Sequence, residues 1–515
     1  MRAEIDSLVD VVFGTADARA SAVAVADAGT SLSYADLATD VAGVATTLAR
    51  AGIKPGDRVI VQFPNSVDFV RAHFGVLAAG CVSVPVDAGA PATTVTAIAR
   101  DSQSAAACIF GGAPAIVAEQ LTRNGVRFVQ TFGENVAPQW RAEGATSRAA
   151  IRPGRGDDLA CILYTTGSTG SPKGVPLRHR HVIAAIENIR QYLRYTPDDR
   201  EVVILPVSHS FGLGHLYCNL RSGGAVRLEP GMAKVGRVLR QLQEFGATGF
   251  PGTPLGFGLL IDRYTDAFRE LARRLRFIVI NSAPLPPARA KQLRDLLPET
   301  ELHVYYGLTE ASRSTFICLN NVPPSHFRSV GKPMRNVDLR VEDAAGLPVP
   351  AGVSGQVSIA GPTVPEEYWN SPSETAHGFK DGRLITGDLG YVDEQGFLFL
   401  NGRLKDQINV GGLKVTPQQV EHVLEAHPSV AEAAVTGVQW PPGSEDEIVV
   451  ALVVRERGTT GDIAEPLRDA CRRELEPHKV PARFFAVDAL PRAETGKLVR
   501  PKVRQLAERM ITGAA

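Results

Sequence analysis

A run of small residues between positions 164 and 175 constrains the fold of this chain more than any other segment. It reads Tyr-Thr-Thr-Gly-Ser-Thr-Gly-Ser-Pro-Lys-Gly-Val and follows the apolar segment 159–163, Leu-Ala-Cys-Ile-Leu. Glycines let a backbone approach an anion closely, and the N–H groups and hydroxyls of such a run can donate to phosphate oxygens. The sequence therefore predicts a buried strand that leads into a phosphate-binding loop, to which Lys173 adds a mobile positive charge.

This run has two alternative interpretations. A stretch rich in Ser, Thr and Gly is, by itself, more often a solvated linker. A Walker-type nucleotide loop needs a glycine directly before its lysine and a hydroxyl residue directly after it. Lys173 follows Pro172 and precedes Gly174, so the spacing excludes a Walker loop.

The composition fits a large soluble protein of the cytoplasm. The 515 residues are 44% hydrophobic, enough to bury a sizeable core divided into at least two domains. With 55 basic and 55 acidic residues the net charge is zero, which removes the electrostatic case for nucleic acid or an anionic membrane as the main partner. The six cysteines are scattered without metal-ligand spacing, which is typical of reduced thiols. No segment resembles a signal peptide or a membrane-spanning helix.

Strand and helix patterns alternate along much of the chain. Residues 58–63 predict a strand, residues 68–79 predict a helix that ends at Gly80, and residues 81–85 predict the next strand. Such a βαβ rhythm implies parallel sheets covered by helices. The expected fold class is therefore α/β.

Five motifs, taken together, resemble the signature of one superfamily. They are the run at 164–175, Tyr305-Tyr306-Gly307-Leu308-Thr309-Glu310, Thr386-Gly387-Asp388, Gly402-Arg403-Leu404-Lys405-Asp406 continuing into Gly411-Gly412, and Pro491-Arg492-Ala493-Glu494-Thr495-Gly496-Lys497. Their residues and order are similar to those of the adenylate-forming enzymes: acyl-CoA synthetases, luciferases and the adenylation domains of peptide synthetases. Segments 32–37 and 56–58 extend the resemblance over nearly the whole chain, which looks most like a stand-alone acyl-CoA synthetase.

The resemblance implies a division into two domains. Residues 1–403 would form a large adenylation core of parallel-rich sheets covered by helices, with the ATP and acyl sites. Residues 404–515 would form a small, mobile α+β lid that carries the catalytic lysine.

The resemblance also implies an ATP site with Mg²⁺. Asp388 would accept hydrogen bonds from both ribose hydroxyls, the segment 282–284 would line one face of adenine, and Tyr306 would stack on the other. Glu310 would be the Mg²⁺ ligand. The full set of matched ATP-binding positions is Thr165, Thr166, Gly167, Ser168, Thr169, Gly170, Lys173, Ser282, Ala283, Pro284, Tyr306, Gly307, Thr309, Asp388 and Arg403.

Adenylation brings two anions together, the acid carboxylate and the α-phosphate. At ~4 Å two unit charges repel by roughly 1 kcal/mol in water and by several times that in a drier site. By resemblance, Lys497 would bridge the two anions, with Thr309, Glu310 and His209 as the other catalytic residues. Electrostatic stabilisers of this kind are typically worth ~100- to 1,000-fold in rate.

A second step would transfer the acyl group to the thiol of CoA after the lid rotates. Lys405 resembles the hinge residue, and Gly411 and Gly412 resemble the turn that lines the pantetheine tunnel. Lys414 is a candidate contact for CoA phosphates, although a lysine beside a turn is more often simply solvated.

The segment 206–214 matches the start of the acyl pocket in the family. His209 is the candidate gate for the carboxylate, and the predicted pocket is lined by His209, Ser210, Phe211, Gly307 and Ala311. Relatives that activate amino acids carry an aspartate here to pair the substrate ammonium, because a buried cation needs a counter-charge. Ser210 is the nearest match, which favours a fatty, aryl or polycyclic acid without an α-amino group. Arg313, just beyond, is a candidate to meet a second anionic group.

Three functions remain in competition. The first is an AMP-forming acyl-CoA synthetase. The second is an acyl-AMP ligase that loads the phosphopantetheine of a separate carrier protein, and the third is a non-adenylating protein that binds acyl-adenylate or acyl-CoA. Intact Lys497, Glu310 and Asp388 disfavour the third, and the Gly411-Gly412 turn favours CoA over a carrier protein. Nothing in the sequence indicates the oligomeric state.

Overall fold

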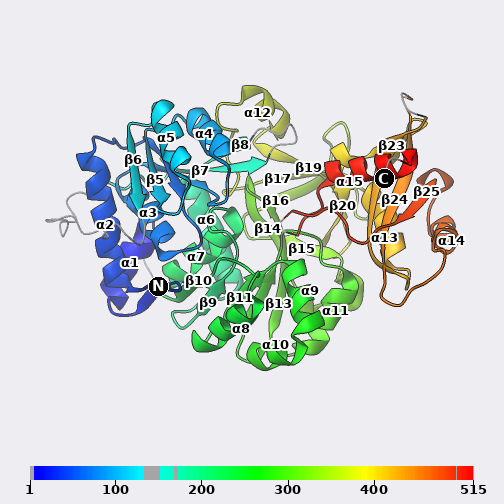
Figure 1. Cartoon of the computed structure of the whole chain (residues 1–515), viewed down its shortest axis with the longest axis horizontal. Coiled ribbons are helices and arrows are strands. Elements are labelled where there is room, and N and C mark those ends of the chain that lie inside the picture. The colour runs from blue at the N-terminus through cyan, green and yellow to red at the C-terminus, as the bar shows by residue number, and fades with distance from the viewer. Residues whose placement is uncertain are drawn as a thin grey trace.

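The structure is a computed structural model that describes residues 5–132, 151–166, 172–441, 444, 446–493 and 496–513. Residues up to Arg403 form a large N-terminal part, and the later residues form a smaller C-terminal part at one end of the molecule (Figure 1). The N-terminal part contains two large sheets with helices packed on them.

The first sheet has six strands in the order β6-β5-β3-β4-β7-β8. The first five run parallel, and β8 is antiparallel to β7. The strands are β3 (Arg58–Gln62), β4 (Val82–Val86), β5 (Ala106–Phe110), β6 (Phe128–Phe132), β7 (Leu159–Thr166) and β8 (Pro172–Arg178). The predicted strand before the phosphate loop is therefore confirmed as β7, and β8 returns beside it.

The predicted strand–helix–strand unit is also confirmed, as β3, α3 (Val67–Ala78) and β4. Ser66 caps α3, because its Oγ accepts a hydrogen bond from the N–H of Phe69 at 3.3 Å. Both faces of β3 are buried. Ile60 packs with the helices α4 (Ala92–Asp101) and α5 (Ala115–Arg123), and Val61 belongs to the cluster on the opposite face.

The second sheet has 14 strands, and its character changes at β13. From β1 through β10, β9, β11 and β12 to β13 the neighbours are parallel, whereas from β13 through β14, β15, β20, β19 and β17 to β16 they are antiparallel. The strands are β1 (Val23–Ala26), β2 (Ser31–Ser33), β9 (Arg200–Val203), β10 (Ala225–Leu228), β11 (Gly249–Gly252), β12 (Phe277–Ile280), β13 (Glu301–Leu308), β14 (Ala311–Cys318), β15 (Ser329–Pro333), β16 (Asp338–Glu342), β17 (Gly355–Ala360), β18 (Phe379–Lys380), β19 (Arg383–Val392) and β20 (Leu398–Arg403).

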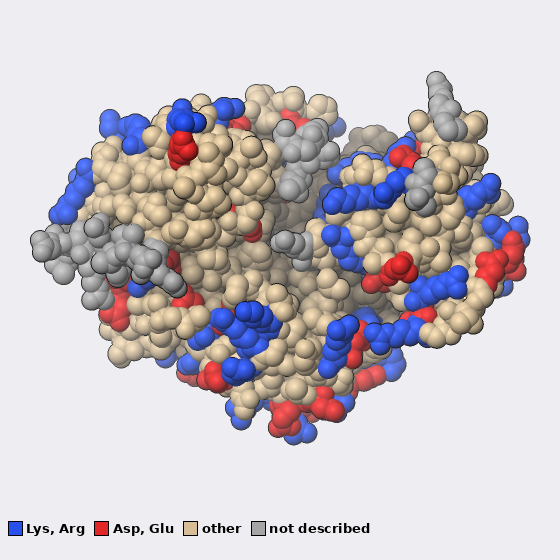
Figure 2. Space-filling view, viewed as in Figure 1, with Lys and Arg blue, Asp and Glu red and all other residues tan. Residues whose placement is uncertain are grey.

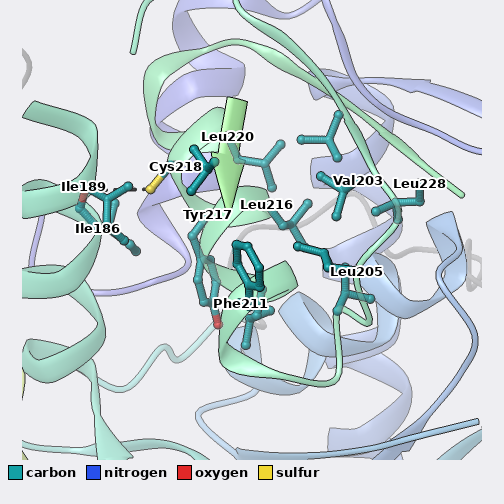
Figure 3. Close-up of a cluster of buried hydrophobic side chains, with 14 of the residues drawn as sticks. Ile186, Ile189, Val203, Leu205, Phe211, Leu216, Tyr217, Cys218, Leu220 and Leu228 are labelled. Carbon is teal, nitrogen blue, oxygen red and sulfur yellow. Dashed lines mark hydrogen bonds between the residues drawn. The ribbon is translucent and has the colours of Figure 1, made fainter. Parts of the chain in front are cut away.

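Helix α7 lies at the centre of the N-terminal part. All of its residues from Phe211 to Ser222 are buried. Leu216 and Leu220 lie toward Val203 of β9 and Leu228 of β10, whereas Cys218 lies toward Ile186 and Ile189 of α6 (Figure 3). Besides α3, α4 and α5, the described helices of this part are α1 (Asp10–Arg19), α2 (Tyr34–Arg50), α6 (His179–Tyr192), α7 (Ser210–Ser222), α8 (Val235–Glu244), α9 (Pro254–Arg263), α10 (Thr265–Ala272), α11 (Pro287–Leu296) and α12 (Pro372–Gly378), with the 3-10 turns η2 (Leu319–Asn321) and η3 (Pro324–His326).

The C-terminal part has its own hydrophobic core. Its two clusters of buried residues start at Ile408, whereas the buried clusters of the N-terminal part end at Leu398. Its elements are η4 (Leu404–Asp406), β21 (Ile408–Val410), β22 (Leu413–Val415), α13 (Pro417–Glu425), β23 (Val430–Gln439), β24 (Glu447–Arg455), α14 (Ala464–Glu474), η5 (Pro477–Lys479), β25 (Arg483–Ala486) and α15 (Arg500–Thr512). The α/β class and the large-plus-small architecture expected from the sequence are thus confirmed. Among the described helices, none has the length and apolarity needed to cross a membrane.

A buried polar contact joins the two halves of the N-terminal part. His73 of α3 lies 2.5 Å from the hydroxyl of Tyr217 of α7 through Nε2, and 2.8 Å from Ser83 Oγ of β4 through Nδ1. The His73 side chain is fully buried. Burial, with a smaller effect from His179, lowers the pKa of His73 to about 3, so the ring is neutral at physiological pH.

This neutral histidine predicts acid destabilisation of the fold. Below about pH 6.5, His73 becomes protonated in the unfolded chain but stays neutral in the folded protein. Its contribution to the free energy of unfolding is therefore complete above that pH and is lost as the pH falls toward about 3. Within that pH range, this residue lowers the free energy of unfolding by about 1.4 kcal/mol per pH unit. Urea unfolding of wild type and His73→Gln between pH 7 and pH 5 should give a shallower pH slope for the variant.

The exposed His377 of α12 provides the control, because His377→Gln removes a histidine without removing a buried one. That variant should keep the wild-type slope. Equal slopes for wild type and His73→Gln would show that His73 does not carry the effect.

Candidate active site

Lys173, the lysine of the predicted phosphate loop, lies at the loop end of the β7–β8 hairpin. Thr165 pairs with Lys173 and Thr166 with Pro172 across the two strands. The predicted loop residues Gly167, Ser168, Thr169 and Gly170 lie outside the described residues. Lys173 forms an ion pair with Glu374 of α12, and its Nζ lies 5.6 Å from the centre of the Tyr368 ring.

The segment before α12 is fixed to the same hairpin. The backbone N–H of Trp369 donates to the carbonyl of Gly174 at 2.9 Å, and its indole N–H donates to the carbonyl of Asp101 at 3.1 Å. These bonds hold the neighbouring Tyr368 against Lys173.

The second motif forms the tip of the β13–β14 hairpin. Thr309 and Glu310 make the turn, and Glu310 Oε1 accepts a hydrogen bond from the hydroxyl of Tyr368 at 2.8 Å. A side chain at Gly307 would bring its Cβ within 2.4 Å of the backbone nitrogen of Arg313, so only glycine fits this position. Tyr368 thus contacts both the lysine of the first motif and the carboxylate of the second.

Tyr368 and Glu374 were not predicted from the sequence. Their partners Glu310 and Lys173 lie 58 and 201 positions away in the chain. The local signal around them, Asn370-Ser371-Pro372, predicts only a turn.

The third and fourth motifs meet at a buried carboxylate. Asp388 of β19 is 5% exposed. Its Oδ2 accepts from the hydroxyl of Tyr306 at 2.6 Å, and its Oδ1 accepts from Arg403 Nε at 2.7 Å. Burial, and then the Asp388 carboxylate, raise the pKa of Tyr306 well above its usual range, so the hydroxyl remains a donor. Each carboxylate oxygen can still accept a further hydrogen bond, as a ribose diol requires.

Lys497 of the C-terminal part lies within electrostatic range of Asp388 and Arg403. The preceding Gly496 lies against the start of α9, where an added Cβ would be 3.1 Å from Cβ of Leu255. The surrounding protein, and then the Arg403 guanidinium, lower the pKa of the Lys497 ammonium, while Asp388 opposes that change. The side chain itself stays open to solvent. Figure 2 shows the surface hollowed between the two parts, with Lys and Arg side chains on the C-terminal side of the hollow.

The segment that follows β12 has an unusual backbone. Ser282 has a φ of +86°, a left-handed conformation that costs energy for any residue other than glycine. Its N–H is satisfied by Asn281 Oδ1 at 2.5 Å. Ser282 and Ala283 are half-buried and Pro284 is exposed, so the segment lies at the surface of the N-terminal part.

The predicted acyl-pocket residues gather around the start of α7. His209 directly precedes the helix and has a solvent-exposed side chain; the surrounding protein lowers its pKa, and Asp87 opposes this shift. The ring of Phe211 packs edge-on against Tyr305, with ring centres 5.2 Å apart. Arg313 donates to the carbonyls of Ser210 and Phe211, which links this helix start to the strand that carries Ala311.

The predicted hinge and CoA residues lie on the C-terminal part. Lys405 is exposed in η4, directly after β20 ends at Arg403. Gly411 and Gly412, with φ of +57° and +83°, form the turn between β21 and β22, and Lys414 is exposed on β22.

The donor set fits a magnesium ion that is held mainly by phosphates. Among the described residues, no three His, Cys, Asp or Glu side chains gather as a metal site. Glu310 offers a carboxylate whose Oε1 is oriented by Tyr368. Mg²⁺ is commonly bound through one or two carboxylates together with substrate phosphates and water, so one oriented carboxylate meets that need.

Residues 12–369 match the family described as AMP-binding enzyme, and residues 419–497 match its C-terminal domain. An oxalate–CoA ligase of Arabidopsis thaliana is 32% identical over 465 residues, covering 88% of this chain and 89% of the relative. The fatty acid–[acyl-carrier-protein] ligase ScoC of Streptomyces coeruleorubidus is 30% identical over 514 residues, covering 97% of this chain and 96% of the relative. The crystal structure of ATP-bound MatB from Rhodopseudomonas palustris superposes with a TM-score of 0.88 at 29% identity, covering 98% of this chain and 100% of that one.

The chain therefore belongs to the family of AMP-binding enzymes. This confirms the superfamily inferred from the five motifs and the enzyme class inferred with it. ATP, Mg²⁺ and CoA are the cofactors that this class implies.

Tyr368→Phe tests whether the Tyr368 hydroxyl orients Glu310. Phenylalanine keeps the ring beside Lys173 but removes the hydrogen bond to the carboxylate. Loss of one such bond, about 1 to 1.5 kcal/mol, should raise the Mg²⁺ and ATP concentrations needed for half-maximal rate roughly 5- to 10-fold, without changing KM for the acid. Pyrophosphate release at varied Mg²⁺ measures this.

Tyr391→Phe is the matched control, because Tyr391 stacks on Phe399 with ring centres 5.0 Å apart and is half-buried. It should behave as wild type. A Tyr368→Phe enzyme with unchanged Mg²⁺ dependence would rule out the orienting role.

Proposed function

We propose that this protein is an AMP-forming acid–CoA ligase. It transfers the AMP moiety of ATP to a carboxylic acid that lacks an α-amino group, releasing pyrophosphate, and then transfers the acyl group to CoA, releasing AMP. The observation that carries the proposal is the buried Asp388 carboxylate, which is bonded to Arg403 and Tyr306, while Gly496, the residue before Lys497, packs against Leu255 of the N-terminal part.

In the first step an oxygen of the acid carboxylate attacks the α-phosphorus of ATP. The new bond joins that oxygen to phosphorus, the bond between the α-phosphorus and the bridging oxygen breaks, and pyrophosphate leaves. Lys497 offsets the repulsion between carboxylate and phosphate. Lys173, with Thr165, Thr166 and the loop 167–170, binds the phosphates.

The nucleotide is held by the groups around Asp388. Asp388 and Arg403 bind the ribose, while the backbone at 282–284 and the ring of Tyr306 enclose the adenine. Gly307 leaves space beside the base, and Thr309 contacts phosphate. Bound Mg²⁺ would neutralise phosphate charge beside Glu310.

In the second step the sulfur of CoA attacks the acyl carbon. A thioester forms, the bond from the acyl carbon to the phosphate oxygen breaks, AMP leaves, and the thiol proton is released. We propose that residues 404–515 rotate as a lid about Lys405 before this step, so that Lys497 withdraws and the Gly411–Gly412 turn and Lys414 face CoA. The separate hydrophobic cores on either side of position 403 support a rigid-body motion of this kind.

A second candidate acceptor is the phosphopantetheine of a carrier protein. The similarity to ScoC, which is named as a fatty acid–[acyl-carrier-protein] ligase, extends over nearly the full chain and favours this alternative. Both alternatives share the first step. A non-adenylating binder is disfavoured, because it has no need of a lysine within electrostatic range of Asp388.

Lys497→Ala should separate the two steps. Adenylation, measured as pyrophosphate release, should fall by ~100-fold or more, because the charge that offsets the repulsion is lost. Thioester formation from supplied acyl-adenylate should stay near the wild-type rate. Lys502→Ala, which removes an exposed lysine of α15, is the control and should leave both steps unchanged. Equal loss of both steps in Lys497→Ala would refute the assigned role.

The acceptor can be identified directly. Incubation with ATP, Mg²⁺ and a pool of carboxylic acids, with CoA, with a phosphopantetheinylated carrier protein or with neither, should give acyl-CoA only in the CoA arm, read by mass spectrometry. An acyl-carrier product with acyl-adenylate persisting beside CoA would support the second candidate. Absence of both acyl-adenylate and pyrophosphate with every acid would contradict adenylation itself.

A further inference from the structure

Arg313, the third residue of β14, is a buried cation with unused hydrogen-bond donors. It is 2% exposed and has a left-handed backbone, with φ of +53°. Nη1 donates to the carbonyl of Ser210 and to Ser312 Oγ, both at 3.1 Å, and Nη2 donates to the carbonyl of Phe211 at 2.7 Å. Nε is buried without a partner. A guanidinium has five N–H donors, so two remain available.

No carboxylate pairs with this guanidinium within the part of the chain that the structure describes. Glu201 shares buried neighbours with Arg313, but it forms no ion pair with it: its Oε1 accepts from the hydroxyl of Tyr195, and its Oε2 lies 2.8 Å from His215 Nδ1 without a hydrogen bond. Burial lowers the pKa of His215, so this ring adds no charge. Burying a charge without a direct partner costs several kcal/mol, which favours an arrangement in which an anion from outside completes the pair.

The guanidinium lies among the residues predicted to form the acyl pocket. It is 5.7 Å from the ring centre of Phe211 and 5.1 Å from that of Tyr305. Gly214 of α7 makes room for it, because a Cβ there would lie 2.4 Å from Nη1. The backbone nitrogen of Arg313 also approaches Gly307, across the turn of the β13–β14 hairpin. Aromatic rings and glycines therefore form the walls around a positive charge.

We infer that the acid activated by this enzyme carries a second anionic group, a carboxylate or a sulfonate, and that Arg313 binds it. The inference rests on the proposed function and names the substrate class of the same site. Arginine matches oxyanions through paired N–H donors, and these bonds are stronger than those between neutral groups. A plain hydrocarbon chain in the same place would leave the guanidinium unpaired.

Arg313 could instead have a purely structural role, because its hydrogen bonds link β14 to the start of α7. The test must therefore separate binding from folding. Wild type, Arg313→Met and Arg313→Lys are compared on acids matched in length: butyrate, succinate and 3-sulfopropionate, then hexanoate and adipate. The exposed Arg335→Met serves as the control variant. AMP release gives kcat and KM for each acid, and thermal unfolding reports the fold.

Wild type should use at least one dianionic acid with a kcat/KM ~10-fold or more above that of its monoanionic match, as expected for one charge-assisted pair. Arg313→Met should lose that preference through KM, Arg313→Lys should keep part of it, and Arg335→Met should behave as wild type. The succinate and 3-sulfopropionate arms decide between carboxylate and sulfonate. A wild-type preference for butyrate and hexanoate, or equal loss for both classes in a folded Arg313→Met enzyme, would overturn the inference.

Binding is followed separately from catalysis. Each acid is added with a non-hydrolysable ATP analogue, and the rise in unfolding temperature is measured. Dianionic acids should stabilise wild type and not Arg313→Met. If no acid releases AMP, the proposed function fails, and this binding measurement still decides the role of Arg313: equal shifts in the two proteins would overturn it.

Discussion

The pairing of Asp388 with Arg403 is the interaction on which the site depends. A carboxylate that is 5% exposed needs a partner, and Arg403 supplies it at 2.7 Å while Tyr306 adds a hydrogen bond at 2.6 Å. The three residues come from β19, β20 and β13, so one charge pair ties together the antiparallel half of the large sheet. Arg403 is also the last residue of β20, directly before the chain enters the C-terminal part. In the proposed function, nucleotide recognition and the connection to the C-terminal part would therefore share this one charge pair.

Much of this arrangement could be predicted because its signals are local. The apolar residues of β3 and α3, with Ser66 before the helix and Gly80 after it, specify a strand–helix–strand unit within about 25 residues. Glycine and hydroxyl residues likewise mark the loop that β7 leads into. The meeting of Tyr306, Asp388 and Arg403 was anticipated only through the family motifs, since no periodicity links three distant strands.

The rest depends on packing that leaves no local trace. The contact of Tyr368 with both Lys173 and Glu310 arises because Trp369 fastens its segment to the β7–β8 hairpin, far away in the sequence. The burial of Arg313 is similar: its sequence neighbours are small polar residues, and only the tertiary contact with α7 removes it from water. The β-strand propensity of the local sequence can predict the strand that carries such a residue. It cannot predict the tertiary environment of the side chain.

The ion pair between Lys173 and Glu374 has a consequence for the energetics of turnover. A phosphate that binds Lys173 has to compete with a carboxylate already in contact with it, so the affinity gained is the difference between two ion pairs and not the strength of one. Such an exchange lowers the affinity for any anion. It also keeps the Lys173 side chain positioned by Glu374 before the anion binds. In the proposed reaction, the departure of pyrophosphate would let Glu374 return to Lys173, so that no uncompensated charge would remain.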